Sequence, residues 1–137
     1  MSSFKKISIF VFTTFFFSFF YGDELLQAQQ ILKKSGEYEK KKKAVEVFLK
    51  STEKERVINM INDMLIYNYD NPNFREDDQI AYYDDVIAEQ LIKILEREKS
   101  PSSFPVLLRI VLYNKRHRDL TVKAAWKAIA AIDWTKE

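Results

Sequence analysis

Residues that end or bend regular structure are scarce in this chain. Among its 137 residues only Gly22 and Gly36 are glycine, and proline occurs only at positions 72, 101 and 105. A sheet protein needs glycine and similar turn residues between its many short strands. The long segments without a breaker instead carry apolar residues at the 3.6-residue period of an amphipathic helix. The sequence therefore predicts an all-α fold.

We expect six helices that form three consecutive pairs. Their apolar stripes place them near residues 23–34, 38–50, 52–68, 79–97, 104–112 and 119–132. Gly36 stands where a left-handed helix C-cap would lie. Residues 52–55 read Thr-Glu-Lys-Glu, which matches a capping box, and Asp119 is expected to cap the last helix. The segment Ser-Pro-Ser-Ser at 100–103 breaks the chain before the fifth helix.

The first 22 residues differ from the rest of the chain. Lys5 and Lys6 precede a run of 14 uncharged, mostly apolar residues, and the first acid is Asp23. A short basic region followed by a short apolar region is typical of a secretory signal peptide. The run is shorter than the roughly 20 residues that cross a bilayer. We therefore expect residues 1–22 to be a signal peptide and residues 23–137 to be one helical domain.

Two alternatives for this segment stay open. Cleavage after Gly22 would leave the bulky Phe20 where a small residue is preferred, so an uncleaved N-terminal anchor is the second interpretation. An ordinary buried helix is the third. The expected location is the periplasm or another extracytoplasmic compartment, with attachment to the inner membrane if the segment is retained.

Cysteine and charge exclude several classes of protein. The chain has no cysteine, which excludes disulfides, a lipid-modified cysteine and a cysteine zinc site. Its net charge is +2, from 22 basic and 20 acidic residues. Because Lys5 and Lys6 lie in the expected leader, the remaining chain is formally neutral. Nothing in this balance indicates a nucleic-acid partner.

The last expected pair carries a family resemblance. Its second helix has an acid, then Val and a basic residue, then alanines and closing aliphatic residues at helical spacing; these are Asp119, Val122, Lys123, Ala125, Ala128, Ile129 and Ile132. Residues 104–108, Phe-Pro-Val-Leu-Leu, precede them. This pattern resembles a HEAT repeat over residues 104–132, which implies an α-solenoid of stacked antiparallel helix pairs.

The resemblance weakens toward the N-terminus. Ala88, Leu91 and Leu95 fit the second-helix pattern of the preceding pair, but Asp85 stands in its valine position and the loop at 69–78 is long for a regular repeat. Residues 23–50 match by hydrophobic period alone. An irregular bundle with an alanine-rich core helix is the alternative fold.

Two further patterns favour repeats. The tripeptides Ile-Tyr-Asn at 66–68 and Leu-Tyr-Asn at 112–114 each end the first helix of a pair, 46 residues apart, which is within the period of about 40–47 residues of HEAT units. The last helix also has small residues at 124, 128 and 131 beside an apolar face that includes Trp126. We therefore expect it to be buried on two sides, Trp126 included.

Residues that could carry catalysis are few. His117 is the only histidine, and it lies among Lys115, Arg116 and Arg118, so we expect a loop residue rather than a metal ligand. Residues 70–73 superficially resemble a calcium loop, but the required glycine is missing and Ala81 stands where the last glutamate belongs. The acidic residues between 76 and 89 suit helix N-termini. No enzyme, cofactor, metal or small-molecule substrate is expected.

Aromatic and charged residues gather around the long loop and before the last helix. Residues 33–34 and 40–43 are basic, 76–89 is acidic, and 109–118 is basic again. These blocks are either solvated faces or docking stripes for a partner or a second copy. The tyrosines either fold inward and pin the loop or form a binding patch. The candidate partner-binding surface is Tyr67, Tyr69, Phe74, Tyr82, Tyr83, Asp84, Asp85, Arg116 and Arg118.

Taken together, these patterns predict an exported, non-enzymatic scaffold or protein-binding module of the bacterial envelope, which binds another protein or itself. The alternatives are a membrane-anchored structural protein and, least favoured, a metal-dependent hydrolase that uses the acidic cluster 76–89. Membrane contact is expected only through residues 1–22 or, if these are retained, through the lysines at 40–43.

Overall fold

A computed structural model of the chain describes residues 23–70 and 78–136, and all regular structure in these residues is helical. The elements are α2 (Glu24–Lys34), α3 (Tyr38–Lys50), α4 (Lys54–Tyr67), α5 (Gln79–Glu98), the short 3-10 helix η1 (Pro101–Ser103), α6 (Phe104–Leu112), the 3-10 helix η2 (Asn114–Arg116) and α7 (Asp119–Ala131). The predicted all-α class and the six predicted helices are confirmed. The expected leader, residues 1–22, lies outside the described residues.

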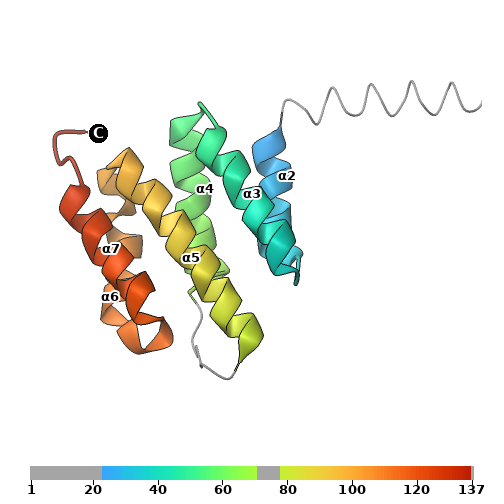
Figure 1. Cartoon of the computed structure of the whole chain (residues 1–137). Helices are drawn as coiled ribbons and strands as arrows, with labels where there is room; N and C mark the ends of the chain where they lie inside the picture. The colour runs from blue at the N-terminus through green and yellow to red at the C-terminus, as the bar shows by residue number, and fades with distance from the viewer. Residues whose placement is uncertain (1–22, 71–77, 137) are drawn as a thin grey trace, which may run out of the picture.

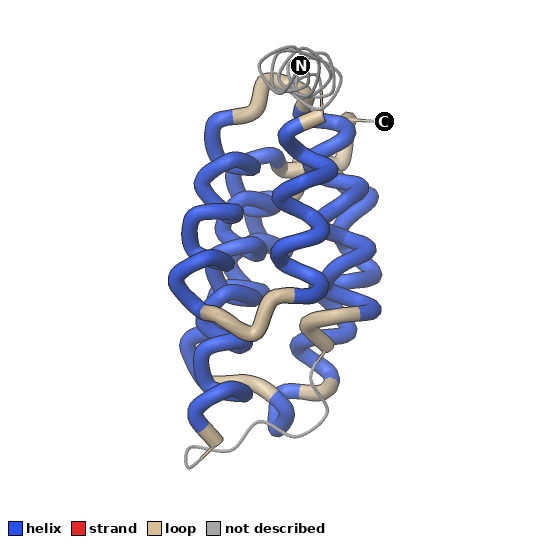
Figure 2. Tube along the Cα trace, turned by 90° about the vertical axis from the view of Figure 1, so that its right-hand side faces the viewer, coloured by secondary structure: helices blue, strands red, loops and turns tan. Residues whose placement is uncertain are grey.

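The helices lie in two layers (Figure 1). Each layer takes alternate helices: α2, α4 and α6 form one, and α3, α5 and α7 form the other. Within each pair the two helices pack on each other across the layers, and neighbouring pairs pack side by side. Figure 2, turned by 90°, shows the helix axes running along a common direction. In the described part of the chain, no helix is long and apolar enough to span a membrane.

The core is continuous through all three pairs, and α5 is its centre. This helix buries residues on two adjacent faces, because it packs on α3 and α7 in its own layer and on α4 in the other. Its fully buried side chains include Ile87, Leu91, Ile92 and Leu95. Burial of such an aliphatic side chain contributes about 1.5–3 kcal/mol. A helix of this kind needs neighbours on both sides.

The last helix has one buried face fewer than expected. Ala124, Ala125 and Ala128 are buried where α7 packs on α5 and α6, which agrees with the small-residue strip. Trp126, however, is 55% exposed, and Leu112 at the end of α6 is exposed too. The prediction that Trp126 is buried is therefore wrong. Its face of α7 points away from α5 and meets no further helix among the described residues.

Two predicted helix ends are also wrong. Gly36 does not adopt a left-handed conformation; α2 ends at Ser35 in an extended conformation instead. The one positive φ in the described residues belongs to Lys99, at 60°, where α5 ends. The capping box at 52–55 is not formed either. The side chain of Ser51, one residue earlier, accepts a hydrogen bond from the Glu53 amide at 3.1 Å.

Candidate functional site

Two residues of the predicted partner-binding surface, Tyr69 and Asp85, are buried. Tyr69 is 2% exposed, and its hydroxyl donates a hydrogen bond to the carbonyl oxygen of Leu32 at 2.5 Å. Burial raises the pKa of this phenol, and the nearby Asp84 carboxylate raises it further. The side chain therefore pins the end of α4 to α2. Placing Tyr69 on a binding surface was wrong, and its role is the inward-folded alternative.

Of the other aromatic residues of the prediction, Tyr82 and Tyr83 are in contact, with ring centroids 5.4 Å apart and the rings at 90°. Tyr67 is 79% exposed at the end of α4. Tyr83 is half-buried and packs on Tyr38, with ring centroids 4.4 Å apart. The ring of Tyr82 lies 5.2 Å from the guanidinium of Arg118. Phe74 lies outside the described residues.

Asp84 lies opposite the basic segment of α3. Its carboxylate accepts a hydrogen bond from Nζ of Lys41 at 2.8 Å. Lys41 is only 7% exposed, and its ammonium also lies 5.0 Å from the centroid of the Tyr69 ring. The ion pair joins α3 to α5 across the first two pairs. The ammonium of Lys41 is therefore enclosed, whereas 32% of the Asp84 side chain stays exposed.

Asp85 is the centre of a buried polar cluster. It is 1% exposed, and its carboxylate accepts hydrogen bonds from the Arg118 amide at 2.8 Å and from the Thr121 hydroxyl at 2.6 Å. Nδ1 of His117 lies 2.7 Å from its other oxygen. The carboxylate of α5 thus stands at the N-terminus of α7, where an anion stabilises free amides and the helix dipole. Its assignment to a partner-binding surface was wrong.

The same cluster explains why Asp119 makes no cap. The residue before α7 is Arg118, which makes no side-chain capping bond, and Asp119 is exposed. A carboxylate from a distant helix does what a local side chain was expected to do. The prediction that Asp119 caps this helix is wrong.

Further ion pairs involve residues of the predicted charge blocks. Arg118 donates two hydrogen bonds to Oε1 of Glu89, at 3.1 and 2.9 Å. Asp70, at the end of the described part of the α4 connection, accepts from Arg109 at 2.6 Å. The guanidinium of Arg116 lies 4.4 Å from the ring centroid of Tyr113. Acidic and basic segments that look like opposite stripes in the sequence therefore pair within the fold at these positions.

His117 follows η2, in the loop where it was expected, but its side chain is fully buried. Asp85 holds one ring nitrogen, and the other, Nε2, lies 4.0 Å from Oδ1 of Asp70. Within the described residues, neither Nε2 of His117 nor Oδ1 of Asp70 has a hydrogen-bond partner. Among the described residues no group of three or more histidine, cysteine or acidic side chains is placed to hold a metal ion. The polar contacts of this cluster hold the end of α4, the middle of α5 and the N-terminus of α7 together.

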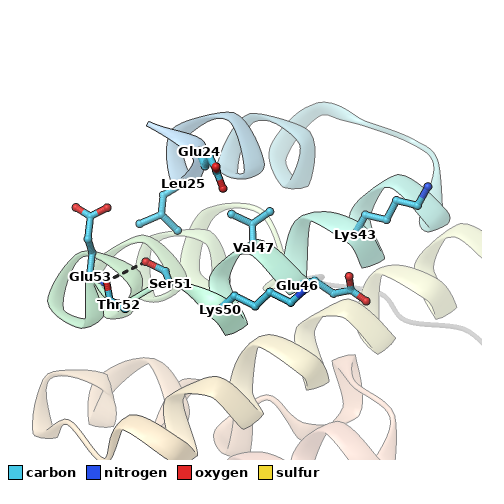
Figure 3. A pocket seen from close by; sticks show the side chains of 9 residues that line it. All are labelled: Glu24, Leu25, Lys43, Glu46, Val47, Lys50, Ser51, Thr52 and Glu53. Atoms are coloured by element: carbon cyan, nitrogen blue, oxygen red, sulfur yellow. Dashed lines mark hydrogen bonds between the residues drawn. The ribbon is translucent and has the colours of Figure 1, made fainter. Parts of the chain in front are cut away.

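A different feature remains open to a ligand, on the outer side of the first pair. A groove of about 460 Å³ begins beside the loop at Ser51–Glu53 and is lined by Leu25 and Val47. Figure 3 shows these two side chains pointing from α2 and α3 toward the space between the helices. A second hollow of about 580 Å³ continues from it, because both are lined by Glu24, Lys43 and Val47. We call this continuous feature the α2–α3 groove.

The floor of the α2–α3 groove is apolar in its second hollow. Ala28 and Ala44 are buried beneath it, and the partly exposed side chains of Ile31 and Val47 form its walls. Small residues at the floor leave room for a side chain from outside to approach the two helix backbones. Among the described residues no other helix covers this face.

Four charged side chains along the rim of the α2–α3 groove make no salt bridge with another described residue, whereas Lys40 and Glu53 at its ends do. Lys43, Glu46 and Lys50 follow one another on α3 at spacings of three and four residues, and all three line the groove. Glu24 faces them from α2. Within the described residues none of these four side chains makes a salt bridge, whereas the lysines and acids of the other charge blocks do so at several positions.

Inspection of the sequence missed this groove for a physical reason. The apolar stripe of α2 includes Ile31, which stands at helical spacing with Leu25, Ala28 and Leu32. The hydrophobic period does not tell which residue of a stripe lies at its open margin. The signal that was present is the pair of alanines, Ala28 and Ala44, at facing positions of the two helices.

No protein-family model, no curated protein and no solved structure matches the chain. The function is therefore inferred from the residues and their arrangement.

Proposed function

We propose that this chain is an exported, non-enzymatic protein-binding module built as a short α-solenoid of three HEAT-like helix pairs. The observation that carries the proposal is the α2–α3 groove, an apolar floor with charges along its rim at one end of the array. Apolar surface of this kind, bordered by charge, is typical of a protein–protein contact. The partner is a protein or a second copy of the chain.

Three features support the solenoid arrangement. The pairs stack in chain order, so that the first packs on the second and the second on the third. The similar tripeptides at 66–68 and 112–114 end equivalent helices, α4 and α6. The third pair carries the HEAT-like pattern. In stacked arrays each pair depends on its neighbours for stability, and terminal pairs are left with one open face.

Photocrosslinking tests the binding role. A photoreactive amino acid replaces Gln27, an exposed residue on the rim of the groove, and in a matched control it replaces Lys127, an exposed residue of α7. The full chains are expressed in the cells that produce the protein, and crosslinked peptides are identified by mass spectrometry. We expect protein crosslinks from position 27 in excess of those from position 127. Absence of any excess at position 27 would contradict the proposal.

Export is proposed from the sequence of residues 1–22, and a membrane-anchored structural protein is the second candidate. The unfavourable residue Phe20 before the expected cleavage site is the observation that favours the anchor. N-terminal sequencing of the protein from fractionated cells separates the two. A chain that begins at Asp23 in a soluble extracytoplasmic fraction excludes the anchor, and an intact N-terminus in the membrane fraction supports it.

A further inference from the structure

The α2–α3 groove has the dimensions of a helix-binding site. Its lining residues on α3 run from Lys40 to Lys50, two residues that are ten positions apart along the helix. At a rise of 1.5 Å per residue this is about 15 Å, or nearly three helical turns. An apolar ridge with residues at positions i, i+3 or i+4, and i+7 would span the whole floor.

An extended peptide is expected to bind this groove more weakly than a helix. A peptide strand binds well where the edge of a sheet offers free amides and carbonyls. The backbone amides and carbonyls along α2 and α3 are already bonded within their helices, apart from the ends. An occupant must therefore satisfy its own backbone, which a helix does. The alanines at the floor allow a ridge of a third helix to approach to the usual interaxial distance of about 8–10 Å.

The charges on the rim determine which charged residues a bound helix needs beside its apolar ridge. The sequence Lys43, Glu46 and Lys50 presents charges of alternating sign over about two turns of α3. The complementary arrangement on a bound helix is acid, base and acid, again three and four residues apart. The lining of the groove has a balance of acids and lysines, with Glu24, Glu46 and Glu53 among the acids, so a uniformly anionic surface such as a membrane is a poorer match.

The chain itself offers no such ligand from the opposite end of the array. The exposed face of α7 does carry apolar residues, including Trp126, but its flanking charges at Lys123 and Lys127 are both basic. These would meet Lys43 and Lys50 of a second copy with the same sign. Like charges placed opposite each other cost affinity and exclude that pairing.

From these observations we infer that the α2–α3 groove binds an amphipathic α-helix of another protein, whose apolar ridge is flanked by acidic, basic and acidic residues in that order. This inference rests on the proposed binding role and names the class of partner. Electrostatic complementarity then determines which helix binds, and the apolar floor supplies the contact area.

Two synthetic helices test the inference. Both are capped 18-residue peptides with the same leucine and alanine ridge and the same composition apart from the flank; one carries Glu-Lys-Glu at the three flanking positions and the other Lys-Glu-Lys. Binding to the purified full chain, kept in solution with a mild non-ionic detergent, is measured by fluorescence anisotropy. We expect the Glu-Lys-Glu peptide to bind at least ten-fold more tightly than its reverse.

A charge-reversed variant makes the test decisive. In Lys43→Glu/Lys50→Glu the preference should invert, so that the Lys-Glu-Lys peptide binds more tightly, which also shows that the variant is folded. The matched control, Lys123→Glu/Lys127→Glu on α7, makes the same change of charge and should keep the original preference. Circular dichroism melting curves accompany each variant.

Three outcomes would overturn the inference. These are equal binding or no binding of the two peptides, a preference that persists in the groove variant, and loss of preference in the α7 control. Binding to phosphatidylglycerol vesicles that disappears in the groove variant, without discrimination between peptides, would assign the groove to a membrane surface instead. Failure of the peptides together with protein crosslinks from position 27 would reject the helix partner while leaving the binding role intact.

Discussion

Replacement of Asp85 with alanine should destabilise the protein more than any other single removal of a charge. The side chain is 1% exposed and accepts from Arg118 and Thr121, and it faces the imidazole of His117. Alanine leaves the backbone amide of Arg118 and a buried ring nitrogen of His117 without their partner, whereas the Thr121 hydroxyl keeps the carbonyl oxygen of residue 85 at 3.2 Å. It also removes the anion at the N-terminus of that helix.

The expected magnitude follows from these contacts. A hydrogen bond to a charged group contributes about 1.5–3 kcal/mol, and breaking a buried ionic arrangement by removing one member costs about 3–5 kcal/mol. Because the three contacts share one carboxylate, their contributions do not add fully. We therefore expect Asp85→Ala to lower the free energy of unfolding by about 3–5 kcal/mol. Asp85→Asn, which keeps the shape and one acceptor oxygen, should lower it by about half as much.

Urea denaturation of the full chain, followed by circular dichroism at 222 nm, measures both values. The matched control is Asp63→Ala, which removes an exposed carboxylate from α4 and should change the free energy of unfolding by less than about 0.5 kcal/mol. The reasoning is refuted if Asp85→Ala costs less than about 1 kcal/mol. It is also refuted if Asp85→Asn and Asp85→Ala cost the same, because the loss would then not depend on the acceptor.

Three further predictions concern Tyr69, Lys99 and Gly36. Burial raises the pKa of Tyr69 above that of an unfolded tyrosine, so the contribution of its neutral form to stability is complete below about pH 10 and is lost as the pH rises further. Urea titrations at pH 9 and 11 should show a larger decrease in the free energy of unfolding for the wild type than for Tyr69→Phe. Equal decreases would contradict this prediction. Lys99 has a φ of 60°, which is unfavourable for a residue with a Cβ, so Lys99→Gly should raise the free energy of unfolding by about 0.5–1 kcal/mol, and a decrease would show that the lysine side chain matters. At Gly36 the φ is not positive and a Cβ would meet nothing within 4 Å, so Gly36→Ala should raise it by about 0.4–1 kcal/mol, and a destabilisation beyond 0.5 kcal/mol would contradict the described turn.

The helices themselves were predictable because they depend on local patterns. The apolar residues of the predicted helix at 52–68 are buried on one side, since residues at this spacing share one face of a helix whatever its neighbours are; they are Val57, Ile58, Ile61, Met64 and Leu65. The breaker at 100–103 likewise separates α5 from α6 as its serines and proline indicate. The sequence by itself determined the all-α class, the number of helices in the described residues and most of the core face of each.

Helix ends and charge partners depended on tertiary structure. Thr52 has the right residue type for a cap, yet the neighbouring Ser51 makes the bond before α4. Asp119 has the right residue type too, but the packing of α7 against α5 brings the carboxylate of Asp85 to the first amides of α7 instead. His117 looks like a solvent-facing residue among cations, but the fold brings a carboxylate of α5 against it.

The candidate binding surface also depended on tertiary structure. Tyr69 and Asp85 belong to residue types that dominate protein interfaces and charged surfaces, and nothing local in the sequence shows that both are enclosed. Exposure is a property of what lies next to a helix, and the hydrophobic period reports only the helix's own faces. For this reason the sequence placed the binding surface beside the long loop, whereas the packing of the pairs leaves Ile31, Val47 and the charges around them open at the first pair.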